Sequence, residues 1–421
     1  MLEKRTPLQI NQAVEKVVAH VLEGSMEEVS IFECEGRYLA EDIVATHDVP
    51  LFTRSGYDGY ALRSIDTVNA SSTEPVKLKV LEEIGAGMVA EHDIGPFETI
   101  RIMTGAKVPN GCDTVIMLEA VKEEEVNGER YITIKREVKK GDHLSIQGEE
   151  AKKGDAILKK GTKINPGVMA VLATFGYGKV RVAVKPRVGI FVTGSELLEV
   201  DEPLEDGKIR NSNAHMIFGQ VIRAGGEPVY LGKVPDVLDT CVEKITGALK
   251  EFDLLITTGG VSVGDYDLMP DVYKALNSEV LFNKIAMRPG SVTTVAVLEG
   301  KYLFGLSGNP SASYVGFELF VRPVVRNMLF CENLHLKVET ARLNVDFKRP
   351  NPMTRFVRTK LSFESGELVI ESAGMDKSNV VTSLAHTDAL AILPGGERGF
   401  EKGDTVKVLL LNDDEGSAWP W

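Results

Sequence analysis

Hydrophobic residues recur along this chain at different spacings, and each spacing predicts a different kind of structure. Over residues 8–23 the apolar positions follow helical intervals and Gly24 comes next, so we predict one amphipathic helix there. From there to about residue 178, short apolar runs lie between glycines and predict mostly β modules. These include a hairpin turning at Asn127-Gly128 and a short helix after Pro166.

Strand-like and helix-like segments alternate from about residue 186 to 330. The runs RVGIFVTG, EPVYLGKV and DLLITTGG are separated or followed by helical patterns at 214–224, 239–252 and 311–329. This alternation predicts βαβ units and a parallel sheet. Residues 336–411 return to short β segments, which predict a small barrel or sandwich, and we expect the tail EGSAWPW to be an exposed end. The fold class is therefore α/β plus β, in several domains.

Composition and charge narrow the possible functions. The net charge of -13 argues against a general nucleic-acid binder, which needs a basic field. The four cysteines lie far apart, a pattern that predicts a reducing compartment and neither a disulfide framework nor a zinc site. The N-terminus lacks an apolar signal region and no run approaches the ~18 apolar residues of a membrane span. We expect a cytoplasmic protein without a membrane partner.

The stretch ITTGGVSVGDYDLMP joins two chemically opposed halves. Gly259, Gly260 and Ser262 offer N–H and hydroxyl donors to an anion, whereas Asp265 and Asp267 would repel it. A hard divalent cation resolves the conflict because it takes oxygens from carboxylates and phosphate together. A tight turn followed by an aspartate cap remains the alternative.

Two more carboxylates follow two other strands of the predicted sheet. Glu196 comes after one strand and Asp236 after another, and a helix cap would explain each alone. Ligands of parallel sheets bind outside the carboxyl ends of the strands, so the carboxylates converge on one crevice. Glu196, Asp236 and Asp267 are accordingly the predicted metal ligands.

Cations and a second glycine turn suggest an anion at the same crevice. Lys284 and Arg288 precede Pro289-Gly290, and an arginine beside a glycine turn suits a phosphate or another tetrahedral oxyanion. Gly308 and Asn309 lead into a helix N-terminus, which also favours anions. A solvated surface side chain is the alternative for Arg288.

Two positions in the N-terminal half complete the candidates. Asp58 lies inside the glycine turn of TRSGYDGYALR, and Thr104 ends the apolar run RIMT. An ordinary turn aspartate is the alternative for Asp58. No histidine is suitably placed for a nucleophilic triad, so metal-assisted chemistry on a phosphate is favoured over covalent catalysis.

Six motifs in order carry a resemblance: SGYDGYALR, RIMTGAKVPNGCDTVIMLE, TGSELL, ITTGGVSVGDYD, RPGSVTT and GLSGNPSAS. Over residues 1–411 the chain resembles the MoeA family of molybdopterin molybdenumtransferases, which includes the E domain of gephyrin. The resemblance implies a homodimer of four-domain subunits and a cleft shared between subunits. It implies adenylylated molybdopterin and molybdate as substrates, Mg²⁺ as cofactor, and release of AMP.

The resemblance also implies domain limits and residue roles. The limits are 1–45 with 146–185 for an elongated N-terminal domain, 46–145 for a β-rich domain, 186–330 for a MogA-like α/β domain, and 336–411 for a small C-terminal β-barrel. The matched catalytic positions are Asp58, Thr104, Glu196, Asp236 and Asp267, with Ser262 in the phosphate-side loop and Arg358 and Ser383 at molybdate. Partners implied are a MogA-like protein and apo-molybdoenzymes.

The chain departs from the family pattern at two places. Ser291-Val292 stands where many members carry Lys-Pro, and Gln147-Gly148-Glu149-Glu150 stands for Arg-Gly-Glu-Asp. The first departure removes a positive charge, which must come from elsewhere. An adenylyltransferase, a non-catalytic scaffold of the same fold, and tungsten in place of molybdenum are the remaining alternatives.

Overall fold

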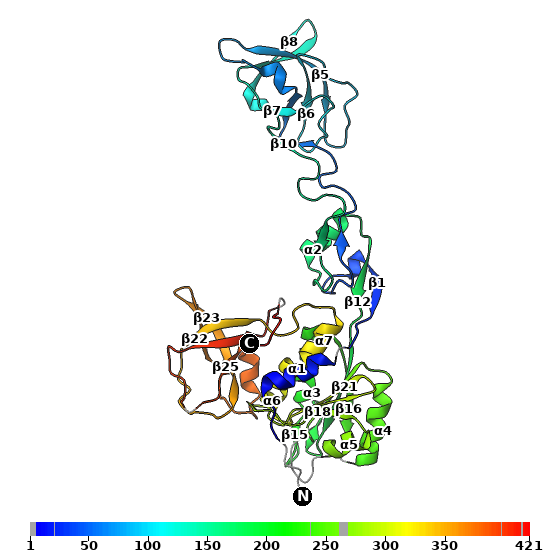
Figure 1. Ribbon diagram of the computed structural model, residues 1–421, viewed down its shortest axis with the longest axis vertical. Helices are drawn as coiled ribbons and strands as arrows, with labels where there is room; N and C mark the ends of the chain where they lie inside the picture. Colours follow the sequence, from blue (N-terminus) through cyan, green and yellow to red (C-terminus); the bar gives the residue numbers. More distant parts are fainter. Residues whose placement is uncertain (1–5, 21, 236, 261–267, 397, 414–415) are drawn as a thin grey trace. The chain divides into compact units, whose positions relative to one another are not determined.

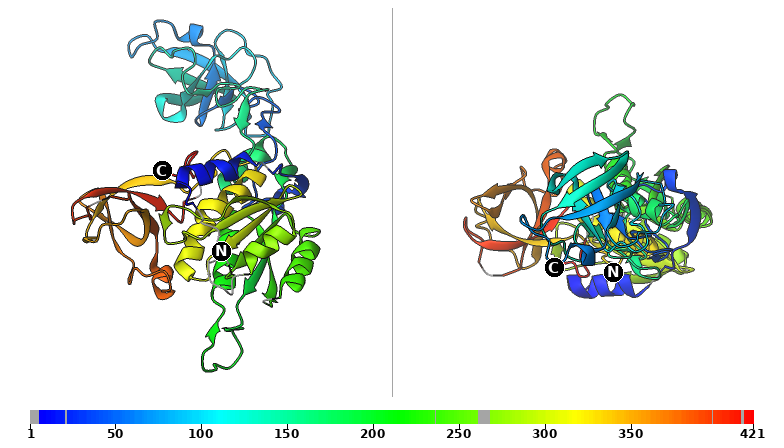
Figure 2. Two further views of the ribbon diagram at one scale, coloured as in Figure 1. Left: turned by 60° about the horizontal axis from the view of Figure 1, so that its bottom comes forward. Right: turned by 90° about the horizontal axis from the view of Figure 1, so that it is seen from above.

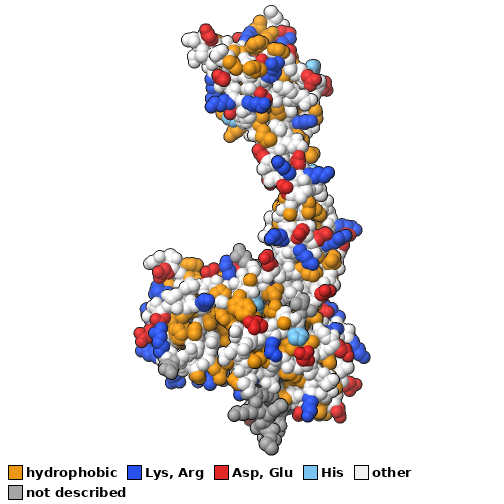
Figure 3. All heavy atoms as spheres, viewed as in Figure 1, with side chains coloured by type: hydrophobic (Ala, Val, Ile, Leu, Met, Phe, Trp, Pro, Cys, Tyr) orange, Lys and Arg blue, Asp and Glu red, His pale blue; other side chains and the backbone are white. Residues whose placement is uncertain are grey.

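The computed structural model describes residues 6–20, 22–235, 237–260, 268–396, 398–413 and 416–421 (Figure 1). The chain separates into two compact units. The first comprises residues 1–41, 160–169 and 179–421, and the second comprises 42–159 and 170–178. On the face drawn in Figure 3, acidic and basic side chains are interspersed over both units. The net charge of -13 is therefore not gathered into one acidic patch on that face.

The second unit is built on a six-stranded sheet of order β7-β4-β6-β5-β9-β8. Its strands are β4 (Gly59–Leu62), β5 (Val76–Ile84), β6 (Glu98–Ile102), β7 (Thr114–Met117), β8 (Val121–Val126) and β9 (Glu129–Ile134). The hairpin β8–β9 turns at Asn127 and Gly128, which both have positive φ, so the Asn-Gly prediction is confirmed. Short elements complete the unit: β2 (Ile43–Val44), β3 (Arg54–Ser55), η2 (Ser64–Thr67), η3 (Leu118–Ala120), β10 (Leu144–Ser145) and β11 (Ala156–Leu158). The predicted helix after Pro166 is α2 (Pro166–Thr174).

The first unit contains a six-stranded sheet of order β16-β13-β17-β21-β20-β18. Its strands are β13 (Arg187–Thr193), β16 (Glu227–Val234), β17 (Leu254–Thr258), β18 (Glu279–Phe282), β20 (Thr294–Leu298) and β21 (Lys301–Leu306). The pairings among β16, β13, β17 and β21 are parallel, and β20 alone runs against its neighbours. The runs predicted as strands are thus strands of one largely parallel sheet.

Helices cover both faces of this sheet, as Figure 2 shows. They are α3 (Asn213–Ala224), α4 (Leu238–Leu249), α5 (Met269–Ala275), α6 (Pro310–Gly316) and α7 (Arg322–Met328). One face packs against α3, α6, α7 and the N-terminal α1 (Ile10–Ala19), and the other against α4 and α5. This part also contains the ladder of β1 (Met26–Ser30) with β12 (Lys179–Ala183), the short pair of β14 (Leu197–Leu198) with β15 (Ile209–Arg210), and η1 (Ile31–Glu33).

Two predicted helices differ in the structure. The helix expected over 8–23 covers only Ile10–Ala19, because Leu8 pairs with the backbone around Ile285 and His20 leaves the helical conformation. The helix expected over 311–329 is interrupted by a π-helical stretch, Phe317–Val321, between α6 and α7. Glu318 is buried in that stretch and forms an ion pair with Arg223. The pairing of Leu8 with Ile285 therefore outweighs the helical pattern at the start of α1.

The C-terminal region forms a closed five-stranded barrel. Its strands are β22 (Val338–Leu343), β23 (Thr354–Glu364), β24 (Glu367–Ser372), β25 (Ala389–Leu393) and β26 (Thr405–Leu410), with η5 (Thr382–His386) before β25. The sheet closes because β23 pairs with both β24 and β25. A strand from the α/β region, β19 (Met287–Arg288), extends the barrel sheet by pairing in parallel with β23.

The tail is only in part the exposed end that its composition suggested. Ser417 exchanges two backbone hydrogen bonds with His335, and the ring of Trp421 lies 6.3 Å from that of Phe356. His335 is consequently buried. The prediction of an exposed end therefore holds for Ala418 and Trp419 and is wrong for Pro420, which is buried.

The multidomain α/β-plus-β class is confirmed by the largely parallel sheet and the closed barrel. Among the residues described, no helix is long and apolar enough to cross a membrane.

Candidate functional site

Two adjoining cavities open in the first unit. The strand-end cavity, of about 860 Å³, lies where β13, β17 and β21 end and includes Thr193, Gly194, Glu196, Asn213, Thr258, Gly259, Gly260, Gly308 and Val381 in its wall. The arginine cavity, of about 780 Å³, lies against the barrel and is lined by Arg288, Lys348, Arg349, Arg355, Arg358 and Lys377 among others. Both contain Val292, Ser307 and Asn309, so the two spaces meet there.

Glycine is required where β17 ends in the strand-end cavity. The N–H of Gly259 donates to the carbonyl oxygen of Leu306 at 3.0 Å, and its φ is 94°. A Cβ at this position would stand 2.5 Å from the carbonyl oxygen of Thr193. The ends of β13 and β17 can therefore approach each other only because residue 259 has no side chain.

Asn213, at the start of α3, joins two segments of the same wall. Its side-chain amide donates to Thr258 Oγ1 and to the carbonyl oxygen of Gly308, both at 2.9 Å. The side chain is buried, so these bonds fix the strand ends relative to each other. Sequence analysis missed this residue, although the polar run Arg210-Asn211-Ser212-Asn213 between a strand and a helix could have indicated it.

Glu196 brings a carboxylate to the strand-end cavity. Its side chain lies over Gly194 and is exposed, and no hydrogen-bond or ion-pair partner is recorded for its carboxylate within the described ranges. Carboxylate oxygens are the ligands that Mg²⁺ takes, so this group has the right chemistry for the predicted cation. Asp236, Asp265, Asp267 and Ser262 lie outside the described residues.

No group of three or more metal-ligating side chains is found in the part of the chain that the structure describes. Glu196 is thus the one predicted ligand whose position is known.

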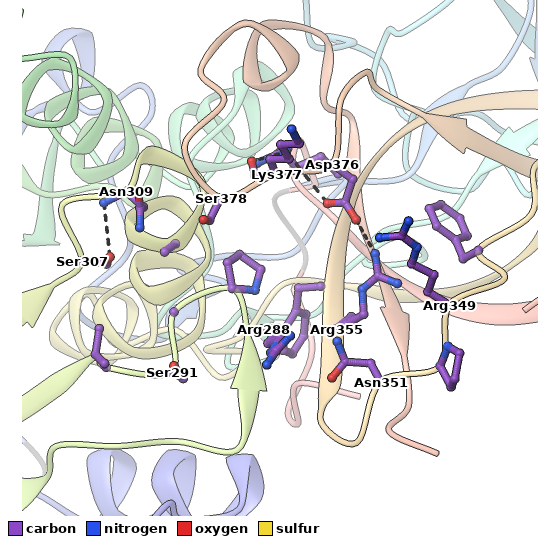
Figure 4. Close-up of a pocket in the computed structure, with 18 of the residues that line it drawn as sticks. Arg288, Ser291, Ser307, Asn309, Arg349, Asn351, Arg355, Asp376, Lys377 and Ser378 are labelled. Carbon is purple, nitrogen blue, oxygen red and sulfur yellow. Dashed lines mark hydrogen bonds and ion pairs between the residues drawn. The ribbon is translucent and has the colours of Figure 1, made fainter. Parts of the chain in front are cut away.

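Six cations and two carboxylates, Asp346 and Asp376, share the arginine cavity. Arg288 lies on β19, directly opposite Arg355 of β23, because the two short strands pair in parallel. Figure 4 shows Arg349 and Arg355 directed toward Asp376. The surplus of positive charge favours an anion, and guanidinium groups suit a tetrahedral oxyanion.

Arg358 is the buried member of this cluster. Its Nη2 atom donates to the carbonyl oxygens of Met375 at 2.9 Å and Lys377 at 3.1 Å, and Asp376 Oδ1 lies 3.9 Å away. Burial lowers the pKa of the guanidinium, while the Asp376 charge opposes that shift. Its Nε atom has no hydrogen-bond partner among the described residues, so the group retains an unused donor.

Two predicted anion-binding residues lie outside both cavity walls. Ser383 is buried in η5 and packs against Gly374, and Lys284 accepts a backbone hydrogen bond from Leu8. Anion binding by Ser383 and Lys284 therefore stays a prediction, and neither residue lines either cavity. Lys348, Arg349 and Arg355 were not predicted, although Arg355 belongs to the same RFVRTK stretch as Arg358.

In the second unit, Asp58 and Thr104 lie side by side. Asp58 Oδ1 accepts the backbone N–H of Thr104 at 2.7 Å and its hydroxyl at 2.8 Å. These hydrogen bonds lower the pKa of the Asp58 carboxyl below its ordinary value. Both residues are exposed, so the turn presents an ionised carboxylate to solvent.

Three family descriptions match the chain: "MoeA N-terminal region (domain I and II)" over residues 8–176, "Probable molybdopterin binding domain" over 189–327, and "MoeA C-terminal region (domain IV)" over 340–411. A curated relative from Bacillus subtilis (strain 168), named molybdopterin molybdenumtransferase, is 53% identical over 421 residues, covering 100% of this chain and 98% of the relative. The protein of that name from Staphylococcus aureus (strain COL) is 46% identical over 414 residues, 98% of each chain. The crystal structure of a molybdopterin biosynthesis moeA protein from Pyrococcus horikoshii OT3 is similar with a TM-score of 0.82 at 32% identity, covering 96% of this chain and 100% of that one.

Proposed function

Because the chain belongs to the MoeA family of molybdopterin molybdenumtransferases, we propose that it inserts molybdenum into adenylylated molybdopterin. In this reaction one water cleaves the phosphate anhydride, and the bridging P–O bond breaks. AMP leaves and the pterin keeps its terminal phosphate. Two Mo–S bonds form to the dithiolene sulfurs as one oxide of molybdate leaves as water with the two thiol protons.

The observation that carries the proposal is the meeting of two cavities at Ser307 and Asn309. One is walled by close-packed strand ends and an acidic side chain, and the other is strongly cationic. A substrate with a phosphate anhydride must meet a separate oxyanion, which requires two anion-accepting spaces in contact. The adjoining cavities supply that arrangement within one unit.

Residue roles follow from position. Gly259, Gly260 and Gly308 would let the phosphate side of the substrate approach the backbone in the strand-end cavity. Arg288 and Arg358 would hold molybdate in the arginine cavity.

Mg²⁺ would be held by Glu196 with Asp236 and Asp267, and when bound it would offset the phosphate charge during cleavage. Asp58 and Thr104 keep their predicted catalytic role on the second unit.

The test is AMP release by the purified protein supplied with adenylylated molybdopterin, with and without Mg²⁺ and molybdate. We expect release that needs Mg²⁺, rises with molybdate, and leaves a cofactor able to activate an apo-molybdoenzyme. Tight substrate binding without release would refute the proposal and favour the scaffold alternative. Tungstate in place of molybdate in the same assay measures the metal preference.

The homodimer and the protein partners belong to the same proposal. Sedimentation of the purified chain should give twice the mass of 46.0 kDa, and a monomer at working concentrations would contradict it.

A further inference from the structure

The arginine cavity contains a carboxylate at the place where its positive charge is concentrated. Asp376 Oδ2 lies 2.5 Å from Arg355 Nη2, and Asp376 Oδ1 lies 3.9 Å from Arg358 Nη2. The other acidic residue of the wall, Asp346, accepts the backbone N–H of Lys402 and pairs with the exposed Lys348 at 3.3 Å. Asp376 is therefore the carboxylate that competes with an incoming anion for the arginines.

The backbone around Asp376 is fixed from two sides. Arg358 donates to the carbonyl oxygens of both neighbours, Met375 and Lys377. Ser311, in the first turn of α6, donates its N–H to the carbonyl oxygen of Ser378 at 3.0 Å. These contacts do not involve the Asp376 side chain, so the loop would hold its place if that carboxylate changed.

The loop over residues 374–381 also joins the two cavities. Asp376, Lys377 and Ser378 line the arginine cavity, whereas Asn379 and Val381 line the strand-end cavity. A charge on this loop therefore changes the electrostatic potential in both cavities, at the place where the two substrates would meet.

We propose that Asp376 is a resident carboxylate that an oxyanion must displace from Arg355, so that it sets the affinity of the arginine cavity for its anion. The inference rests on the proposed function for the identity of that anion, molybdate. In the empty cavity Asp376 orders Arg355, and in the loaded cavity Arg355 turns to the oxyanion. The repulsion that remains between Asp376 and the anion keeps molybdate weakly held and exchangeable, which suits a substrate that must leave for the pterin.

The charge of Arg349 completes the argument. Neither Arg349 nor Arg288 has a recorded ion pair among the residues described, while Arg355 is neutralised by Asp376. These two guanidinium groups supply positive charge to the cavity. Asp376 then offsets part of that charge.

The experiment is titration calorimetry of the full-length protein with sodium molybdate and with perrhenate at one ionic strength. Asp376→Asn removes the charge but keeps an oxygen acceptor for Arg355. Coulomb energies scale with the product of the charges, so we expect about tenfold tighter binding of the molybdate dianion and about threefold for the perrhenate monoanion. Glu371→Gln, which removes the same charge from an exposed position on β24 outside the cavity, should leave both affinities unchanged.

Other outcomes are equally informative. Asp376→Glu keeps the charge and should not tighten binding, whereas a merely structural role would make both variants weaker. Weaker or unchanged molybdate binding by Asp376→Asn overturns this inference alone. Equal molybdate binding by the wild type and Arg288→Ala would place the anion elsewhere, and the assignment of molybdate to this cavity would then fail with it.

Discussion

Replacing Gly259 by alanine tests whether the strand-end cavity depends on the close approach of β13 and β17. The new Cβ would stand 2.5 Å from the Thr193 carbonyl oxygen, at a φ of 94°. The φ strain costs about 1 kcal/mol and the overlap about 2 kcal/mol more.

Gly300 is the matched control. Its φ is 80°, but a Cβ there meets nothing within 4 Å, so Gly300→Ala carries the strain without the overlap. A unit of this size shifts by about 2 °C per kcal/mol, so we expect Gly259→Ala to lower the melting temperature by ~5 °C and Gly300→Ala by ~2 °C.

The assay is calorimetric melting of both variants, followed by the KM for adenylylated molybdopterin. The KM should rise in Gly259→Ala and stay unchanged in Gly300→Ala, because only the first lines the cavity. Equal melting temperatures would refute the reasoning, since they would mean that the strand ends can separate at no cost.

Three further predictions concern charge and pH. Burial, with a neighbouring arginine, lowers the pKa of His335 from 6.5 to about 4, so it folds neutral and the unfolded chain binds the extra proton between these values. The free energy of unfolding should therefore rise by about 3 kcal/mol from pH 4 to 6.5 in the wild type, measured by urea unfolding at each pH. His335→Gln should remove this dependence on pH, whereas the control His386→Gln, at an exposed position, should keep it. Thr104→Val removes one of the hydrogen bonds that lower the pKa of Asp58, so this pKa should rise toward its ordinary value in an NMR titration of the carboxyl group. The stability that Asp58 contributes is lost as the pH falls through the pKa of the folded state. An unchanged pKa in the variant would contradict the assignment. Glu318→Gln leaves buried guanidinium charge without its partner and should cost about 3–5 kcal/mol, seen as a lower urea midpoint; an unchanged midpoint would show that the ion pair contributes no net stability.

Much of the fold could be predicted because its signals are local. The strands β13 and β17 are largely apolar runs, and α3 and α4 have helical periodicity, so their alternation specifies a parallel sheet. The start of α1 and the packing of the tail could not be predicted in this way. Both depend on partners far along the chain, Ile285 and Phe356, and no window of sequence contains them.

The residues of the candidate site also divide into those that local sequence predicts and those that only the fold brings together. Gly259 and Glu196 were found because the strand ends of a parallel sheet converge by topology. Arg349 and Arg355 were missed because they belong to the barrel, and only folding brings them to Arg288. The family resemblance, which the comparisons confirm, named Arg358 but not the cluster around it.

The shared strand β19 limits how the chain could be engineered. Met287 and Arg288 belong by sequence to the α/β region, yet they pair with Thr354 and Arg355 in the barrel sheet. A chimera that exchanged only the barrel with a relative's would replace one side of this ladder and keep the other. The two residues of β19 would therefore have to be exchanged together with the barrel, although β20, β21, α6 and α7 lie between them in the chain and belong to the α/β sheet and its helices.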